Sequence, residues 1–442
     1  MNAMSSQSRK ITYLIIIVCL LVAIVFLGMP ASSEEGSGGR LARLRTKHNL
    51  GEGSLGKVDP SSTTMNLLLL GLRGVATNIL WMEANEHQEH KNWAQLRTTV
   101  DSIILLQPHY TKVWRFQAWN LAYNVSASWD AVADRYFWVK EGIKFLINGS
   151  NRNLENPELL WDTGNFMGNK IGRSDEWRQF RKFFYSDPEP RLNEGVDPEI
   201  NPAQKDNYLV AKDYFTFAND AEEKDPDKQH IMADVLFRHY PTRAQFDYPM
   251  ALQREGIFDQ VTTEAWRQGF EEWTGVYGRE LFDTPGGKIV LEANTDDIAR
   301  LAIQDGVTQE VKREWVDRYQ KMVNYVYWRT QAQVEREELT MQAHRELFQG
   351  EQAFKESRMT EAQELLTKGM EKFEKVMTQN DAMLLDDNAV EEALNAVLLW
   401  QHIHDLEGKQ VPATYPLKPL WDAQQDQVQQ LTNEFRRKYG IQ

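Results

Sequence analysis

An uncharged apolar run near the N-terminus constrains this chain more than any other feature. Ile11 to Leu27 contains no charged residue, and with Gly28 and Met29 the run reaches 19 residues. At 1.5 Å per residue such a helix is roughly 28 Å long, enough to cross the hydrocarbon core of a bilayer. We therefore predict a transmembrane anchor over 11–29, with any globular domain on its C-terminal side.

The charges beside this run predict its orientation. Arg9 and Lys10 precede it, and acidic residues follow it at 34 and 35. The positive-inside rule then places residues 1–10 in the cytoplasm as a short head and the bulk of the chain on the exocytoplasmic, periplasmic side. A cleaved signal peptide is the alternative, but Met29 stands where cleavage needs a small residue.

The net charge of −14 is unevenly distributed. Residues 1–47 hold six basic and two acidic residues, a net of +4, so the other 395 residues carry −18. An acidic body argues against a nucleic-acid partner, which needs a clustered basic face. The single cysteine, Cys19, lies in the apolar run and excludes both an internal disulfide and a Cys-rich zinc site. Residues 30–64 are interpreted as a flexible linker, whose basic cluster at 40–47 has contact with anionic lipid as its alternative role.

A second apolar stretch, 65–82, opens the remaining sequence. Arg73 and two asparagines interrupt it, and polar groups are costly in hydrocarbon. We predict a buried helix that opens the folded domain rather than a second crossing. From there onward, apolar residues recur three and four apart between Pro- and Asn-bearing breaks, which predicts a mainly α protein built of helical hairpins.

Residues 156–188 resemble a tetratricopeptide repeat, a unit of two antiparallel helices. Leu160 takes the first large apolar position, and Gly164 stands four residues later, where the helices approach closely. The turn at 170–172 comes one residue late, and bulky aromatic residues occupy the second helix in place of the usual alanine. The second helix is therefore a loose match.

Two further segments resemble the same unit. Pro108 is followed by Trp114 and Ala118 at the spacing that opens such a repeat, with a partner helix predicted over 129–146. Residues 350–373 match without a gap, and the packing positions of their second helix are Ala362, Leu366 and Gly369. We therefore predict repeats over 65–188 and further repeat-like helices within 301–442.

The resemblance has consequences for architecture and function. The stretch 66–172 also looks like the N-terminal part of membrane-anchored, repeat-containing bacterial proteins of mostly unassigned function. It implies a solenoid of stacked hairpins whose first helices line a partner-binding surface. The residues implied for that surface are Trp114, Trp119, Asn120, Tyr123, Trp161, Asn165 and Lys170. Packing within the hairpins is an equally good interpretation of Trp114 and Trp161.

Residues 189–300 do not fit the repeat. They are rich in proline, aspartate and aromatic residues, and we predict an irregular insertion with short helices at 230–238 and 262–275 and a lone strand at 288–291. Its aromatic residues are interpreted as core, with a glycan-binding groove as the alternative.

A polar, strongly helical stretch follows from Thr308 to about Gln349. Apolar residues at 4-4-3-4 spacing predict one buried face of a long helix, formed by Val311, Trp315, Tyr319, Met322 and Val326. A homodimeric coiled coil through 308–349 is the alternative.

The sharpest cluster of polar residues is Glu83, Glu86, His87 and His90, which share one face of a helix. Two carboxylates and two imidazoles are able to bind a divalent metal, but the spacing matches no established ligand motif. We interpret these four residues as a solvated face and keep metal binding as the alternative.

No catalytic signature is present, and no cofactor is expected. We predict a membrane-anchored scaffold or assembly factor of the cell envelope that binds a protein partner through its helical repeats. The alternatives are an envelope enzyme, a glycan-directed hydrolase with its site in 189–300, and a metal-binding helical protein.

Overall fold

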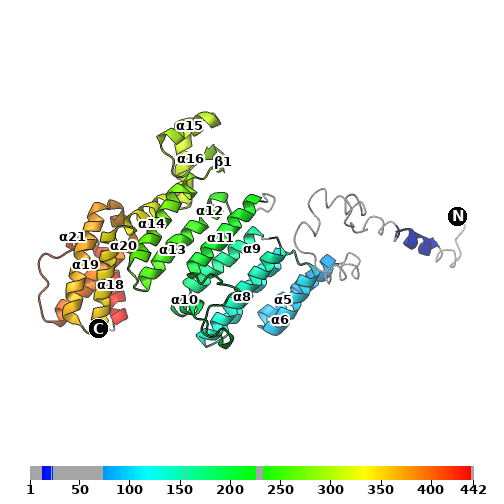
Figure 1. The fold of residues 1–442 in the computed structure, drawn as a ribbon, viewed down its shortest axis with the longest axis horizontal. Coiled ribbons are helices and arrows are strands. Elements are labelled where there is room, and N and C mark those ends of the chain that lie inside the picture. The colour runs from blue at the N-terminus through cyan, green and yellow to red at the C-terminus, as the bar shows by residue number, and fades with distance from the viewer. Residues whose placement is uncertain (1–11, 21, 23–72, 155, 225–231, 440–442) are drawn as a thin grey trace. The chain divides into compact units, whose positions relative to one another are not determined.

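The computed structural model describes residues 12–20, 22, 73–154, 156–224 and 232–439. Within these residues the chain is mainly α, as predicted, with eighteen α-helices, α5 to α22, and one two-stranded hairpin (Figure 1). It divides into two compact units, Met1–Thr163 and Gly164–Gln442. The division falls inside α9 (Pro157–Asn165), within the range 65–188 that was predicted as one set of repeats.

The predicted anchor lies partly outside the described residues. Residues 12–20 and 22 are described, and all of them are helical. Among the described helices, none combines the length and the apolar character that a membrane crossing requires. The predicted head at 1–10 and the linker at 30–64 lie outside the described residues.

The first unit is built of paired helices. Small residues set its helix crossings: a Cβ added to Gly142 would lie 2.8 Å from the carbonyl oxygen of Ala118, and one added to Gly149 would lie 2.8 Å from the Trp114 ring. Such close approach lets the flanking apolar side chains interdigitate. Its helical elements are α5 (Arg73–Glu89), α6 (Trp93–Leu106), α7 (Thr111–Trp119), η1 (Asn120–Val125), α8 (Val132–Arg152) and the start of α9.

Helix α5 differs from the prediction of a buried helix. Its Thr77 and Ala84 side chains are buried, whereas Val75, Ile79 and Met82 are 57%, 61% and 72% exposed. The helix packs on α6, and its Trp81 ring lies 4.8 Å from the Phe116 ring of α7 between centroids. Its apolar residues are spread around the whole helix, so these neighbours do not cover all of them.

Two π-helical segments continue α7 and α9. These are η1 (Asn120–Val125) and η2 (Phe166–Ile171). A π-turn closes its hydrogen bond over one more residue than an α-turn and therefore absorbs one extra residue. The predicted turn at 170–172 is wrong, because residues 170 and 171 lie in η2, Gly172 caps it, and the chain turns at 173–176. Each π-segment carries an asparagine pair four residues apart: Asn124 Nδ2 donates to Asn120 Oδ1 over 2.6 Å, and Asn169 donates to Asn165.

The segment 189–300, predicted to be irregular, is largely helical in the second unit. Proline does not break it, because Pro241 stands in the first turn of α13, where no backbone N–H is needed, and Pro249 is accepted inside the same helix. The aromatic residues fill a core, as interpreted: Phe246, Trp266 and Trp273 are fully buried. Helix α10 (Trp177–Tyr185) precedes the segment, which contains η3 (Pro190–Leu192), α11 (Asn207–Lys224), α12 (Asp234–Arg238), α13 (Tyr240–Arg254) and α14 (Gln260–Gly275).

A small knob follows α14 and the short helix η4 (Tyr277–Arg279). It holds an antiparallel hairpin, β1 (Phe282–Thr284) with β2 (Gly287–Ile289), so the predicted lone strand is paired. Helices α15 (Thr295–Asp305) and α16 (Gln309–Met322) complete it (Figure 1). The buried Lys312 ammonium donates to the carbonyl oxygens of Gly286 and Lys288 and to Asp305 Oδ2, at 2.9, 3.1 and 2.6 Å, which joins hairpin and helices.

The predicted long helix over 308–349 is wrong. The chain breaks twice there, which gives α16, α17 (Tyr325–Glu335) and α18 (Glu338–Lys355), and the first break has Asn324 at φ 51°. A continuous coiled coil over this stretch is excluded with it. The predicted buried face is also wrong at Val311, Met322 and Val326, which are exposed. Asparagine accepts the left-handed conformation more readily than most residues, so it permits this break.

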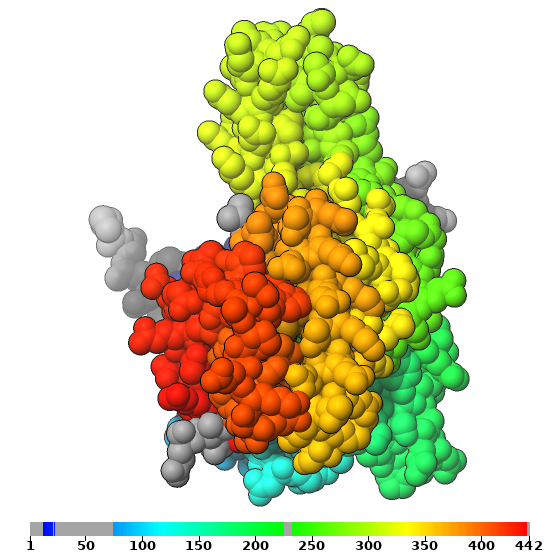
Figure 2. Space-filling view, turned by 90° about the vertical axis from the view of Figure 1, so that its left-hand side faces the viewer, coloured from blue at the N-terminus to red at the C-terminus, as the bar shows by residue number. Residues whose placement is uncertain are grey.

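The C-terminal helices pack into a bundle with α18, and their orange and red surface faces the viewer in Figure 2. The hairpin predicted at 350–373 lies within the longer helix pair α18 and α19 (Met359–Gln379), and its packing positions are confirmed, because Ala362, Leu366 and Gly369 are buried. Leucine and glycine pair reciprocally across it: Gly350 faces Leu366, and Gly369 faces Leu347. The remaining helices are η5 (Asp381–Leu385), α20 (Asp387–Leu406), α21 (Lys418–Ala423) and α22 (Gln425–Tyr439).

Candidate binding groove

Two adjoining cavities lie within the second unit. The first, here called the aromatic cavity, has a volume of about 550 Å³, and the second, here called the basic pocket, has about 740 Å³. Both volumes fall in the range of ligand-binding pockets, roughly 300–1,000 Å³. The cavities share four lining residues, Arg254, Phe348, Glu351 and Lys438, and together they form one groove.

The aromatic cavity is lined from α13, α14, α17, α18, α20 and α22. Its wall combines rings with side-chain amides, which offers both apolar contact and hydrogen bonds. The rings include Phe258, Trp266, Tyr327, Trp328, Phe435 and Tyr439. The amides are Gln253, Gln331, Asn388 and Asn395. The Nε1–H group of the fully buried Trp266 has no acceptor among the described residues.

A histidine between two glutamates is the strongest electrostatic feature of the aromatic cavity. His344 Nδ1 lies 2.7 Å from Glu392 Oε1, and His344 Nε2 lies 3.2 Å from Glu335 Oε1. Burial alone would lower the pKa of His344, but the two carboxylates outweigh it and hold that pKa well above its ordinary value. Both ring nitrogens therefore carry protons and donate, which makes this residue an imidazolium.

Glu335 is the most enclosed carboxylate of this cluster. Gln253 and Gln331 each donate a side-chain N–H to it over 2.9 Å. Burial would raise the pKa of Glu335, yet the His344 charge and these donors keep it below its usual value. The cluster is thus a buried ion pair with its acceptors satisfied, which locks the positions of α17, α18 and α20 around the cavity.

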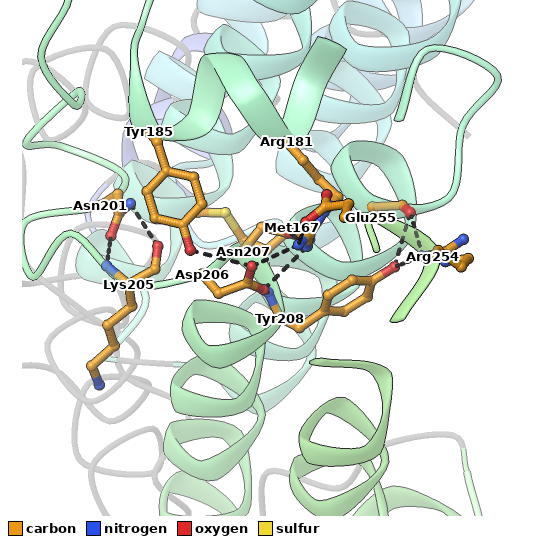
Figure 3. Close-up of polar contacts among 11 residues, drawn as sticks. Met167, Arg181, Tyr185, Asn201, Lys205, Asp206, Asn207, Tyr208, Arg254 and Glu255 are labelled. Atoms are coloured by element: carbon orange, nitrogen blue, oxygen red, sulfur yellow. Dashed lines mark hydrogen bonds and ion pairs between the residues drawn. The ribbon is translucent and has the colours of Figure 1, made fainter. Parts of the chain in front are cut away.

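The basic pocket is positioned by a buried network around Arg181 on α10 (Figure 3). Its guanidinium group pairs with Glu255 through Nε and Oε1 at 2.6 Å, and with Asp206 through Nη2 and Oδ2 at 2.9 Å. Arg181 also donates to Asn207 Oδ1 over 2.5 Å, and the Asn207 amide donates to the Met167 carbonyl oxygen over 2.8 Å. One side chain thereby ties α10, η2, α11 and the C-terminal end of α13 together.

The electrostatics of this network follow from its burial. Burial would lower the pKa of Arg181, but the bonds to Glu255 and Asp206 outweigh it and raise that pKa. The pKa of Asp206 is raised by burial, and the nearby Arg181 opposes that shift.

Tyr208 donates its hydroxyl to the Gly172 carbonyl over 2.9 Å, and the small Gly172 is needed because a Cβ would lie 2.4 Å from that hydroxyl.

The predicted partner-binding residues fall in both units and have different environments. In the first unit Trp114 is buried, with its Nε1 donating to the Pro108 carbonyl over 2.9 Å, and Asn120 is also buried. Both side chains are enclosed in the packing of α7, η1 and α8. Trp119 is 45% exposed and stacks on Tyr123 with the ring centroids 5.7 Å apart. Of the predicted residues in the first unit, only Trp119 and Tyr123 therefore lie together at an exposed surface, where α7 continues into η1.

Trp161, Asn165 and Lys170 are half-buried in α9 and η2. The boundary between the two compact units separates Trp161 from the other two. In the second unit, Asn165 accepts the hydrogen bond from Asn169 across the π-turn. This bond stabilises the π-turn locally.

The candidate metal residues do not converge on one point. His87 Nε2 lies 3.4 Å from Glu83 Oε1, while His90 Nδ1 contacts the backbone carbonyl of Glu86 over 2.8 Å. Among the described residues, which include all four, no group of three or more His, Cys, Asp and Glu side chains is arranged to hold a metal. The helix face carries a contact between His87 and Glu83 and a contact of His90 with the backbone.

Sequence reasoning missed the groove, although one signal for it was present. Residues 177–182 read WRQFRK and place three cations on one short helix of an otherwise acidic chain. The second half of the groove comes from α13, α18 and α22, which lie far away in sequence. Comparison of the chain with family models, with curated proteins and with solved structures finds no match.

Proposed function

We propose that this chain is a membrane-anchored scaffold or assembly factor of the cell envelope, with its bulk on the exocytoplasmic side. Its helical hairpins, which resemble tetratricopeptide repeats, would bind a segment of a partner protein. The length and lack of charge of 11–29 support the anchor. The charge asymmetry across it supports the orientation.

The crossings of the hairpins support a repeat-like scaffold. Glycines at 142, 149, 350 and 369 sit where a Cβ would collide with the neighbouring helix, at 2.7–2.8 Å from the nearest atom. Helices packed this closely form rigid pairs, and each pair leaves a face for its neighbour or for a partner. Binding surfaces of stacked hairpins arise in this way.

The groove of the second unit carries the proposal. A cavity that combines aromatic rings, side-chain amides and an adjoining cationic wall suits a peptide, which offers apolar side chains, backbone N–H and C=O groups and charges at once. Its walls are held by the Arg181 network and the His344 cluster, so the groove is preformed and little ordering is needed on binding.

Site-specific photo-crosslinking in the native membrane tests this function. A photoreactive residue in place of Met250, which lines the aromatic cavity and is 37% exposed, is expected to capture one reproducible partner protein. The matched control is Ile303, which is 82% exposed on α15 and lines neither cavity. Captured peptides are then mapped by mass spectrometry, and the purified partner is tested for binding to the full chain.

Two outcomes would overturn the proposal. The same products from positions 250 and 303 would mean that the groove has no part in the capture. Repeated absence of any product from position 250 would mean that the groove binds no partner protein.

A further inference from the structure

The basic pocket reverses the charge of the surrounding chain. Its lining holds two carboxylates, Glu255 and Glu351, and both are already engaged: Glu255 by Arg181, and Glu351 by Lys355 and Lys438 at 3.1 and 2.7 Å. The full set of lining cations is Arg178, Arg181, Lys182, Arg254, Lys355 and Lys438. Three of these cations therefore have no carboxylate of the pocket as a partner, although the protein has a net charge of −14.

These three are Arg178, Lys182 and Arg254. Within the described residues none of them has a carboxylate partner; Arg254 donates only to the Gly172 carbonyl and the Tyr208 hydroxyl, over 3.4 and 3.3 Å. Side chains of like charge repel one another when they line one pocket. An anion between them would relieve that repulsion.

The geometry around Trp177 brings two of these cations to one place. The guanidinium carbon of Arg178 lies 5.0 Å from the centroid of the Trp177 ring, and that of Arg254 lies 4.7 Å from the same centroid. The two groups come from α10 and α13 and are at most about 10 Å apart. Planar guanidinium groups bind carboxylates and phosphates through paired N–H donors, so this arrangement fits an anionic group.

The adjoining aromatic cavity identifies the kind of anion. Trp266 offers a buried N–H without an acceptor among the described residues, and the Asn395 amide also lines this cavity. The acyl chain of a lipid would satisfy neither group and would face the charged His344 cluster. A peptide supplies backbone carbonyls for these donors and an apolar side chain for the rings.

We propose that the groove binds an acidic peptide segment of the partner protein, with Asp or Glu carboxylates at Arg178, Lys182 and Arg254 and a neighbouring aromatic side chain in the aromatic cavity. This inference rests on the proposed function and names the chemistry of its ligand. Residues 48–442 carry a net charge of −18 and on the whole repel such a segment, so within this acidic body the groove is the place where it is accepted.

Fluorescence anisotropy of the full chain with three labelled decapeptides tests the inference. The first probe carries four acidic residues beside a phenylalanine, the second replaces the acids by their amides, and the third replaces the phenylalanine by serine. We expect the first to bind most tightly and to weaken as salt is raised. Either replacement is expected to cost about tenfold in affinity.

Variants locate the site. Arg178→Gln with Lys182→Gln alters two exposed side chains and is expected to weaken the first probe about tenfold or more. Arg267→Gln is the matched control, because Arg267 is an exposed cation on α14 that pairs with Glu264 and Glu271 outside both cavities. Its affinity should equal that of the unaltered chain. Circular dichroism and thermal melts confirm that the variants fold.

Several results would overturn the inference. These are equal binding of the acidic and amide probes, an equal loss in the control variant, and full displacement of the probe by inorganic phosphate or by vesicles of anionic lipid. Crosslinking separates this failure from that of the proposed function. If position 250 captures a partner through a segment without acidic residues, the scaffold stands and the ligand assignment falls.

Discussion

Arg181 and Glu255 form a two-bonded ion pair that connects α10 to the C-terminal end of α13, with Nε to Oε1 at 2.6 Å and Nη2 to Oε2 at 3.1 Å. The Arg181 side chain is 3% exposed, and its second partner, Asp206, is 2% exposed. Arginine is suited to this position because its planar fork serves two carboxylates at once. The pair holds one wall of the groove in place.

Replacement of Arg181 by methionine is expected to destabilise the second unit strongly. The variant leaves the Asp206 carboxylate buried without a cation, and breaking a buried pair in this way costs about 3–5 kcal/mol. Urea unfolding followed by circular dichroism measures the loss. Arg191→Met is the control, because Arg191 is 58% exposed beside Glu189 and solvent screens such surface pairs, so its loss should be small. Equal losses in the two variants would contradict the assignment.

Gly369→Ala is expected to cost about 1–3 kcal/mol through overpacking. The added Cβ would lie 2.7 Å from Leu347 Cδ2 and 2.9 Å from the Leu347 backbone nitrogen, and that backbone cannot move aside without shifting α18. Gly275→Ala is the matched control, since no atom lies within 4 Å of its added Cβ. It should be neutral or stabilising by up to about 1 kcal/mol. Thermal melts of both variants provide the comparison, and a neutral Gly369→Ala would disprove the tight crossing.

His344 predicts a loss of stability on the alkaline side of neutrality. Its folded-state pKa is raised above 6.5, so the stabilisation is complete below pH 6.5 and is lost as pH rises through the folded-state value. In that window the free energy of unfolding should fall by up to about 1.4 kcal/mol per pH unit. His344→Gln should remove this slope in urea titrations between pH 6.5 and 9.

The control for that measurement is His402→Gln. His402 contacts the rings of Phe354 and Phe435 and has no carboxylate partner among the described residues. This variant should keep the slope of the unaltered chain. A slope that persists in His344→Gln would show that another group causes it.

The lowered pKa of His239 predicts the opposite dependence of stability on pH. Burial lowers the pKa of His239 to about 4, although its bond to the Leu236 carbonyl opposes that shift. The unfolded chain therefore takes up the proton first, and stability is lost as pH falls from 6.5 to about 4. The loss attributed to this residue is on the order of 3 kcal/mol.

His239→Asn tests the assignment, because it removes the titrating group and keeps an N–H donor for the Leu236 carbonyl. Carboxylates titrate in the same window in both proteins, so the quantity to measure is the difference between their unfolding free energies at each pH. That difference should shrink as pH falls to 4. A constant difference would sink the prediction.

Local features were the predictable part of the fold. The α18–α19 hairpin was predicted because its turn and its small residues lie within one short stretch, so sequence spacing alone defines the crossing. Helix starts follow the same rule: Asn294 caps α15 in a capping box with Asp297, and Asp386 caps α20. These signals act over three or four residues.

Long-range features could not be predicted in this way. Arg181 lies 74 residues from Glu255, and no spacing rule connects them. The prediction of one long helix over 308–349 is wrong for a related reason. A helical pattern continues through Asn324, but packing of α17 against α14 selects the left-handed conformation there. Tertiary contacts overrode the local preference.

The two π-turns also change the direction in which the side chains after them point. An α-helix turns by about 100° per residue, so the extra residue in η1 or η2 rotates everything after it by about that angle relative to an unbroken helix. Ile171, the last residue of η2, is fully buried, so this rotation acts on a side chain of the core. Deleting one residue from either π-segment would restore the regular helix and turn its last side chains away from their core. In both hairpins, one residue more or less in the chain decides which face of the helix is buried.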